Sequence, residues 1–243
     1  MEMMLFLFST VLKPMDSLSL AKEFTLIRNY DGRLYFAPFI GKSIFLLDEN
    51  ERLQPITFTD DINYRIYDFH ITPFALYLAN GVSIEKFYLK SGIKEKLYSQ
   101  DNISAFVITP SEELIIAEEE KNELIFLDFT NKIKLRKFDL RIKDIKLFNK
   151  IIYILTNNEL LFCDEYGNIF DRRKLTGRFE KLFVTGNKII LFSAGEKEIY
   201  ILNGEGRKNE LPHTITDIAE YNEFIVILDG YGSTLYFYKP TDF

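Results

Sequence analysis

A unit of three short apolar runs recurs six times along this chain, and it constrains the fold more than any other feature. In the fourth copy the runs are Ile142–Leu147, Ile151–Leu155 and Leu160–Cys163. Each run is rich in Ile, Leu, Phe and Tyr, which suit the pleated, half-buried surface of a β-strand. The unit therefore predicts three consecutive β-strands separated by tight turns.

Two sets of anchor positions keep the same register in all six copies. The first is the apolar pair that opens each unit: Phe24/Ile27, Ile66/Phe69, Ile103/Phe106, Ile142/Ile145, Phe179/Leu182 and Ile215/Ile218. The second is the polar residue that ends the third run: Asp48, Lys90, Asp128, Asp164, Asn203 and Lys239. Both sets span 191 residues from the first copy to the last, with 36 to 42 residues between successive opening pairs. The repeat is therefore a property of the whole chain.

A fourth, more polar run follows the third in five copies: Glu51–Thr57, Ile93–Tyr98, Ile133–Phe138, Ile169–Leu175 and Lys208–Leu211. Four short antiparallel strands in a repeat of this length form the blade of a β-propeller, with the polar strand at the outer edge. The sequence thus predicts an all-β fold, a six-bladed β-propeller of four-stranded antiparallel blades.

The sixth copy lacks its fourth run, because only Pro240–Phe243 follow Lys239. Asp16–Ala21 precede the first copy in the position of a fourth strand. We expect this segment, extended by Met3–Leu12, to complete the sixth blade and so remove exposed sheet edges. This divides the chain into an N-terminal segment, residues 1–15, and a single propeller domain, residues 16–243.

The apolar run Met3–Leu12 has two interpretations. It is an extra strand, or it is the core of a signal peptide with the small residues of Ser19–Ala21 before the cleavage point. Glu2 in place of a basic start favours the strand. Ten residues are too few to span a bilayer, so we expect no membrane span. Localisation stays open between the cytoplasm and export through a weak N-terminal signal.

The charge balance argues against a nucleic-acid partner. The net charge is −6, and affinity for phosphate backbones comes mostly from Lys and Arg. The basic clusters Lys132–Lys137 and Asp171–Lys174 fall in the fourth runs or their turns, where we expect solvated outer faces. Cys163 is the only cysteine, which excludes an intramolecular disulfide. It lies in an apolar run and is expected to be a small core residue.

The repeats resemble those of six-bladed β-propellers of the NHL-like and bacterial six-bladed families. The resemblance lies in units such as Ile142–Ile145, Ile152–Leu155 and Phe162–Asn168, and it covers nearly the whole chain after Asp16. The chain lacks the Trp-Asp dipeptide of WD40 blades and the double glycine of kelch blades. The resemblance implies an architecture and a tendency to bind ligands or proteins, without a particular activity.

The sequence contains no catalytic motif that could assign a catalytic or cofactor-binding residue. The only histidines, His70 and His213, are expected to be structural or solvated. At the third position of the opening motif, the second, fourth and sixth copies carry Asp68, Asp144 and Asp217. If this position faces the centre of the ring, three converging carboxylates would suit a divalent cation such as calcium. The alternative, which we favour, is that each aspartate caps a local backbone turn.

We expect a noncatalytic, monomeric binding module that recognises a protein, peptide or glycan through loops at one end of the ring. The alternative is a metal-dependent hydrolase of the propeller lactonase type that uses the central channel. That class would need Glu, Asp and Asn side chains around one metal, and no such set can be matched here. Clustered carboxylates and amides in the central funnel would favour the hydrolase, whereas an aromatic, uncharged surface would favour binding.

Overall fold

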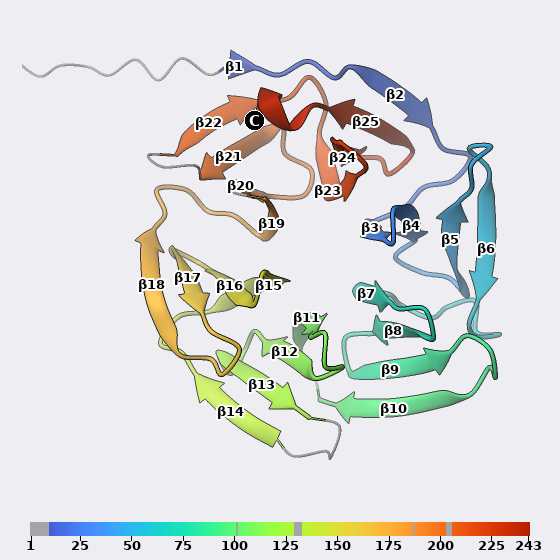
Figure 1. Ribbon diagram of the computed structural model, residues 1–243, viewed down its shortest axis with the longest axis vertical. Coiled ribbons are helices and arrows are strands. Elements are labelled where there is room, and N and C mark those ends of the chain that lie inside the picture. The colour runs from blue at the N-terminus through green and yellow to red at the C-terminus, as the bar shows by residue number, and fades with distance from the viewer. Residues whose placement is uncertain (1–9, 101, 129–132, 187, 203–205) are drawn as a thin grey trace, which may run out of the picture.

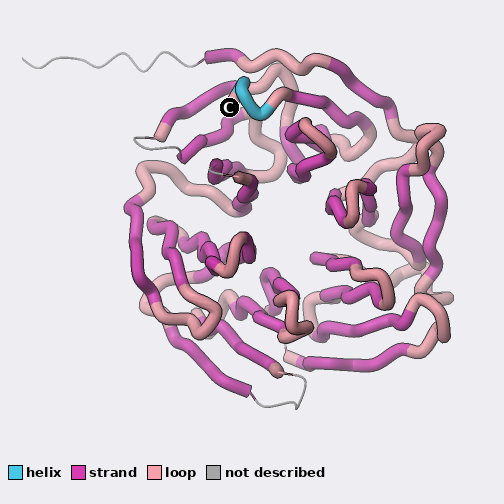
Figure 2. Tube along the Cα trace, viewed as in Figure 1, coloured by secondary structure: helices cyan, strands magenta, loops and turns pink. Residues whose placement is uncertain are grey.

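The protein is a ring of six blades arranged around a central axis, as Figure 1 shows. The structure is a computed structural model that describes residues 10–100, 102–128, 133–186, 188–202 and 206–243. Within these residues, the only helical element is a 3₁₀ turn at Pro240–Asp242, and short loops join the strands (Figure 2). The predicted all-β, six-bladed propeller is confirmed.

Each blade is an antiparallel sheet whose strands follow one another outwards from the axis. From blade one to blade six, the innermost strands are β3 (Leu26–Tyr30), β7 (Asp68–Ile71), β11 (Ile103–Ile108), β15 (Ile142–Phe148), β19 (Lys181–Thr185) and β23 (Ile215–Tyr221). The second strands are β4 (Arg33–Ala37), β8 (Ala75–Ala79), β12 (Leu114–Glu118), β16 (Ile151–Thr156), β20 (Lys188–Phe192) and β24 (Phe224–Asp229). The third strands are β5 (Ser43–Leu47), β9 (Ser83–Tyr88), β13 (Glu123–Leu127), β17 (Glu159–Cys163), β21 (Glu198–Leu202) and β25 (Thr234–Tyr238).

The outermost strands match the polar fourth runs of the repeat to within about two residues. In blades one to five they are β6 (Leu53–Thr57), β10 (Lys94–Ser99), β14 (Ile133–Lys137), β18 (Ile169–Lys174) and β22 (Arg207–Glu210). In blade six the outermost strand is β2 (Asp16–Ser19), which pairs antiparallel with β25. The closure of the ring by an N-terminal strand is therefore confirmed.

The segment before β2 lies in a different blade from the one expected. β1 (Thr10–Val11) pairs parallel with β22 and forms a fifth strand on blade five instead of extending blade six. The chain crosses between the two blades at Lys13 and Pro14, where proline has no N–H to donate to a sheet. The rest of the predicted run Met3–Leu12, residues 3–9, lies outside the described residues.

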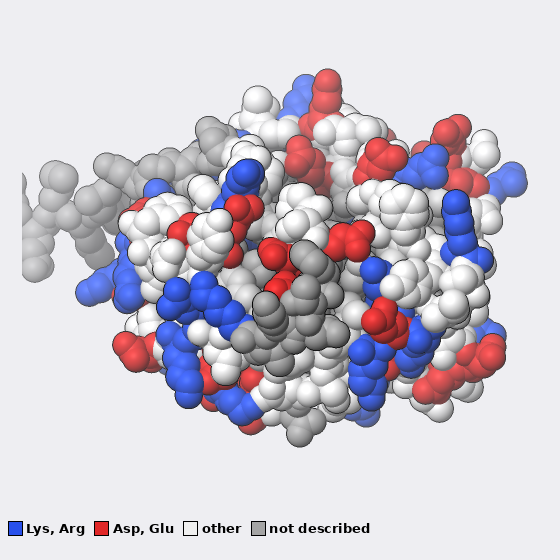
Figure 3. Space-filling view, turned by 60° about the horizontal axis from the view of Figure 1, so that its bottom comes forward, with Lys and Arg blue, Asp and Glu red and all other residues white. Residues whose placement is uncertain are grey.

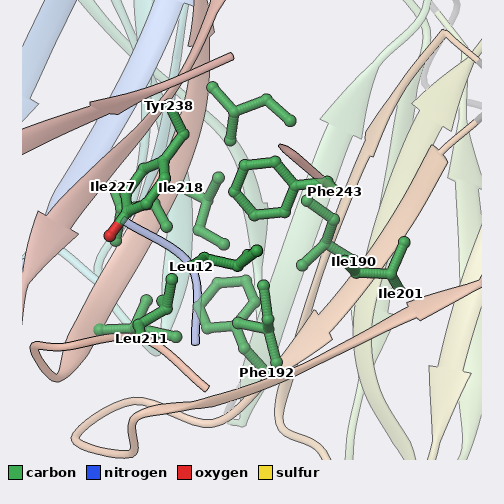
Figure 4. Close-up of a cluster of buried hydrophobic side chains, with 12 residues drawn as sticks. Leu12, Ile190, Phe192, Ile201, Leu211, Ile218, Ile227, Tyr238 and Phe243 are labelled. Atoms are coloured by element: carbon green, nitrogen blue, oxygen red, sulfur yellow. The ribbon is translucent and has the colours of Figure 1, made fainter. Parts of the chain in front are cut away.

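The core is divided into clusters that each join two neighbouring blades. Blades five and six, for example, share the cluster shown in Figure 4, in which Leu12 packs among Ile190, Phe192, Tyr238 and Phe243. Equivalent clusters join each of the other neighbouring pairs, including blades six and one. Cys163 is fully buried in one of them, and burial raises the pKa of its thiol to about 12. The expectation of a core cysteine is confirmed.

Charged side chains cover the outer strands. On the face in Figure 3, basic and acidic side chains are interspersed, and neither sign forms a continuous field. The residues of β18 between its two ends are mostly exposed, in agreement with the expectation for the Asp171–Lys174 cluster. In the part of the chain that the structure describes, no helix is long and apolar enough to cross a membrane.

Candidate functional site

The alternating aspartates Asp68, Asp144 and Asp217 all lie at the start of innermost strands, and all three are buried. The strand pairing shifts just before two of them, between Ile142 and Asp144 and between Ile215 and Asp217. Such bulges redirect a side chain out of the regular pleat. The backbone therefore places these carboxylates where they can reach the neighbouring blade.

Two of these aspartates make the same contact with the next blade around the ring. Asp217 of blade six accepts a hydrogen bond from the backbone N–H of Ile27 in blade one, at 3.1 Å. Asp144 of blade four accepts one from the N–H of Leu182 in blade five, at 3.0 Å. The other carboxylate oxygen of each accepts the N–H of the following residue, at 3.1 Å for Ile218 and 2.8 Å for Ile145. These aspartates thus connect blades by capping buried backbone N–H groups.

Arg28 joins the third aspartate, Asp68, to Asp217. Its guanidinium bonds to Asp68 of blade two and lies 2.6 Å from the Asp217 carboxylate of blade six. Burial alone would lower the pKa of Arg28, but the two carboxylates outweigh it and raise the pKa. Burial likewise opposes ionisation of Asp217, yet Arg28, Lys181 and Lys146 hold its pKa below the usual value. Lys146 also lies 3.0 Å from Asp144. The centre of the ring is thus a balanced set of paired charges.

This arrangement supports a structural role for the three aspartates. Among the described residues, no group of three or more His, Cys, Asp and Glu side chains is placed to hold a metal ion. The carboxylates already accept hydrogen bonds from backbone, arginine or lysine groups. The calcium site stays a prediction.

The end of the ring at which the chain enters the innermost strands carries an exposed apolar patch. We call this the entry end; it holds the inter-blade connections and the turns between second and third strands. The patch consists of Phe39, Ile40, Ile62, Tyr67 and Val82, which are 41–66% exposed. These residues come from the β4–β5 turn, the connection between blades one and two, and the β8–β9 turn.

Short contacts fix the patch on the scaffold. The rings of Phe39 and Tyr67 meet edge to face with centroids 5.3 Å apart. The carbonyl of Phe39 accepts the N–H of Ile66 at 2.8 Å, which ties the turn of blade one to the start of blade two. Tyr67 lies against Gly81, where a Cβ would sit only 2.9 Å from the tyrosine ring. Gly81 also has φ +89°, so both space and backbone conformation require glycine there.

A charged pocket of about 490 Å³ adjoins the patch at the centre of the entry end. Tyr67 and Gly81 line one side, and Glu119, Arg141 and Lys143 line the other. One oxygen of Glu119 accepts from Arg141 at 2.8 Å and from Lys143 at 2.7 Å. The entry end therefore combines apolar side chains over blades one and two with paired charges over blades three and four.

The opposite end holds a second pocket, of about 580 Å³, among the turns between innermost and second strands. His70 of β7 lines it together with mostly apolar side chains. The other histidine, His213, stacks on Tyr236 with centroids 3.7 Å apart and bonds to the Tyr238 hydroxyl at 2.7 Å. His213 is thus packed and hydrogen-bonded as a structural histidine would be, whereas His70 has a different environment.

Sequence reasoning missed Arg28 and the apolar patch. Arg28 follows Ile27 in the opening motif, a position at which the second and third copies carry His70 and Val107. The signal available in the sequence was the arginine itself, since it lies in the same opening motif that carries an aspartate in alternate copies. The signal for the patch was Phe39 and Ile40, which are large apolar residues in a turn.

Comparison with solved structures finds other propellers. A streptogramin B lyase structure matches at 12% identity and a TM-score of 0.66, covering 93% of this chain and 88% of that one. YCF48 bound to D1 peptide matches at 13% identity and 0.66, covering 95% and 97%. An auxiliary nutrient binding protein from Bacteroides thetaiotaomicron matches at 12% identity and 0.67, covering 88% and 68%. At these identities the likeness shows the fold alone. No protein-family model and no curated sequence matches the chain.

Proposed function

We propose that this propeller is a noncatalytic recognition module that binds a protein or peptide at its entry end. The observation that carries the proposal is the exposed apolar patch, which continues through Tyr67 and Gly81 into the charged pocket. Exposed apolar groups that adjoin one another commonly mark sites of protein interaction. The patch is held by the turns of a rigid scaffold, an arrangement common in binding proteins.

The composition of this surface matches that of a protein interface. Aromatic and aliphatic side chains lie next to the ion-paired Glu119, Arg141 and Lys143, and protein interfaces likewise combine apolar and polar side chains. The expected ligand is an extended peptide or a loop that places an apolar side chain against Tyr67 and a charged or polar group at the pocket. One structural neighbour, YCF48 bound to D1 peptide, supports this class of function, since a propeller of similar fold binds a peptide there.

The hydrolase alternative has less support from the side chains present. Carboxylates and an amide, Glu119, Glu120, Glu180 and Asn102, do lie at the entry-end pocket. However, Glu119 is engaged by two cations, which compete with a metal for its oxygens. The pocket thus has the carboxylates and the amide that a hydrolase would need, but among the described residues no three His, Cys, Asp or Glu side chains are placed to hold one metal ion.

A random peptide library displayed on phage tests the proposal. The wild-type protein should enrich peptides that share an apolar anchor residue. A variant with Ile62→Glu and Val82→Glu should bind those peptides at least about tenfold more weakly, because a charge would then have to be buried against the ligand. A glycan array probed in parallel tests glycans, the third class of ligand expected from the sequence.

The matched control carries Leu135→Glu and Phe170→Glu, which change two exposed apolar residues on the outer strands β14 and β18. Its peptide binding should equal that of the wild type, and all three proteins should melt within a few degrees of one another. The proposal is wrong if no peptide is enriched, or if the enriched peptides bind equally well to the patch variant.

A further inference from the structure

The pocket at the end opposite the peptide surface has the dimensions and lining of a small-molecule site. We call this the hairpin end, because the turns between innermost and second strands of blades one to four surround the pocket. Its volume of about 580 Å³ lies in the range of ligand pockets. Its walls are mainly apolar and include Tyr30, Phe74, Ile108, Leu147 and Phe148.

The polar lining comprises His70 on the innermost strand β7 and, in the turns, Thr72, Thr109, Glu112, Asn149 and Lys150. Thr72 is occupied by its own turn, since its hydroxyl contacts the carbonyl of Ala75 at 3.2 Å and accepts the N–H of Ala75 at 3.1 Å. Thr109 is likewise bonded to Ser111 and to the N–H of Glu113. Neither ring nitrogen of His70 has a hydrogen-bond partner within the described chain, although the side chain is half-buried.

The neighbouring charges explain why His70 is left unpaired. The carboxylate of Asp68, two residues earlier, is already engaged by Arg28 and by the N–H of Phe69. Burial lowers the pKa of His70 to about 4; Asp68 opposes this shift and Arg28 adds to it. The imidazole is therefore neutral at pH 7, with one nitrogen that donates and one that accepts. An imidazole in this state can hydrogen-bond to a ligand group that donates, to one that accepts, or to one that does both.

We propose that the hairpin-end pocket binds a small, ring-bearing apolar molecule whose hydroxyl group hydrogen-bonds to His70. A hydroxyl both donates and accepts, so it matches either nitrogen of the imidazole. The aromatic and aliphatic walls would cover the rings, while His70 fixes their orientation, as the few polar groups of ligand pockets generally do. The site is separate from the peptide surface proposed above and does not depend on it.

A pair of probes tests the inference directly. 2-Naphthol carries the hydroxyl, whereas 2-methylnaphthalene has the same rings and no group that can donate or accept a hydrogen bond. Titration of each into the protein is followed by two-dimensional NMR of the histidine side chains. We expect 2-naphthol to shift the His70 resonances and to bind about tenfold more tightly than 2-methylnaphthalene, a ratio typical of one buried hydrogen bond.

Variants assign the effect to His70. His70→Leu should bind the two probes equally, while His70→Gln, which keeps a donor and an acceptor, should retain part of the preference. Tyr231→Ala, which changes an exposed aromatic residue outside the pocket lining, should behave as the wild type. Ile62→Glu with Val82→Glu should also leave naphthol binding unchanged, which separates this site from the peptide surface.

Three results would overturn the inference. The first is the absence of any change at His70 at millimolar 2-naphthol. The second is equal affinity of the wild type for both probes. The third is an unchanged preference for 2-naphthol in His70→Leu, since the hydroxyl would then be recognised elsewhere.

Discussion

Arg28 lies between carboxylates contributed by the two neighbouring blades. Its guanidinium joins Asp68 and Asp217, and it also donates to the carbonyl of Ile27 at 2.7 Å. Both aspartates are buried, so bulk water could not take the place of the arginine as their partner. Removing one partner from a buried ion pair is usually far more costly than replacing the whole pair, because a charge is left uncompensated.

Arg28→Met should therefore lower the free energy of unfolding by about 3–5 kcal/mol. Chemical denaturation at pH 7 measures the change. Arg33→Met is the matched control, since Arg33 is an exposed residue of the same hairpin, and its effect should stay below about 0.5 kcal/mol. Equal losses in the two variants would show that the central ion pairs do not stabilise the ring.

Asp144 allows the structural and metal-binding interpretations to be compared. Asp144→Asn should lower the free energy of unfolding by about 1–3 kcal/mol, because its carboxylate accepts from Leu182 and Lys146 in buried surroundings. Calcium titration during thermal melting should leave the melting temperature unchanged in the wild type and in the variant. A calcium-dependent rise in the wild type that Asp144→Ala abolishes would instead support the cation site formed with Asp68 and Asp217.

His70 should make the protein less stable as the pH falls. Its folded-state pKa of about 4 lies below the ordinary value of 6.5, so below pH 6.5 the unfolded chain binds a proton that the folded chain does not. The resulting loss is about 2–3 kcal/mol at pH 4.5 relative to pH 7. Urea denaturation at the two pH values, compared between wild type and His70→Leu, isolates this contribution.

The comparison of wild type with His70→Leu also separates the titration of His70 from those of His213 and Asp217. The pKa of His213 is lowered by burial as well, but His213 is present in both proteins and its effect cancels. The lowered pKa of Asp217 acts at more acidic pH, because the stability it provides is lost only below the unfolded aspartate value near 3.9. If the wild type and His70→Leu lose the same stability on acidification, His70 is accessible to protons in the folded state.

At the scale of strands, the two N-terminal elements tie the first described residues to the last two blades. β2 supplies the fourth strand of blade six, and β1 adds two parallel pairs to the edge of blade five. Leu12 lies between them with its N–H bonded to the carbonyl of Glu210 at 2.9 Å and its side chain buried (Figure 4). The two strands differ in their contribution, because β2 supplies the missing fourth strand of blade six, whereas β1 adds a fifth strand to a blade that already has four.

Truncation separates the two contributions. Leu12→Ala should cost about 2–4 kcal/mol, as expected for a buried leucine, and should leave a monomer. Removal of residues 1–20 should expose the edge of β25 and cause association, which light scattering after size exclusion measures. A variant lacking residues 1–9 keeps β1 and β2 and serves as the control. A monomeric, equally stable 1–20 deletion would contradict the role of β2.

At the scale of the whole molecule, the sequence predicted the ring because its information is repeated. The six opening pairs and the fourth runs recur at a nearly constant spacing, so a strand whose pattern is weak in one copy can be placed from the other copies. The observed strands follow these positions closely. β1 was assigned to the wrong blade because it occurs once, contributes only two residue pairs and is not part of the repeat.

The site was less predictable, since its contacts join different copies. The alternation of Asp68, Asp144 and Asp217 was visible in the sequence, but their partners Ile27, Leu182 and Arg28 belong to adjacent blades. The bulges that direct the side chains of Asp144 and Asp217 towards the neighbouring blade leave no sequence signal of their own. The entry-end patch required the fold as well, because residues from three separate connecting segments meet there.

The closure of blade six also sets the order of events during synthesis of the chain. Asp16 pairs with Phe237, a partner that is translated more than two hundred residues later. At 5–20 residues per second, this delay amounts to roughly 10–45 s. Throughout that time β2 lacks its native partner strand β25. The blades between them have to form while the ring is still open. During this interval the uncovered strand edges of a growing polypeptide of this design are accessible to chaperones and to other nascent chains.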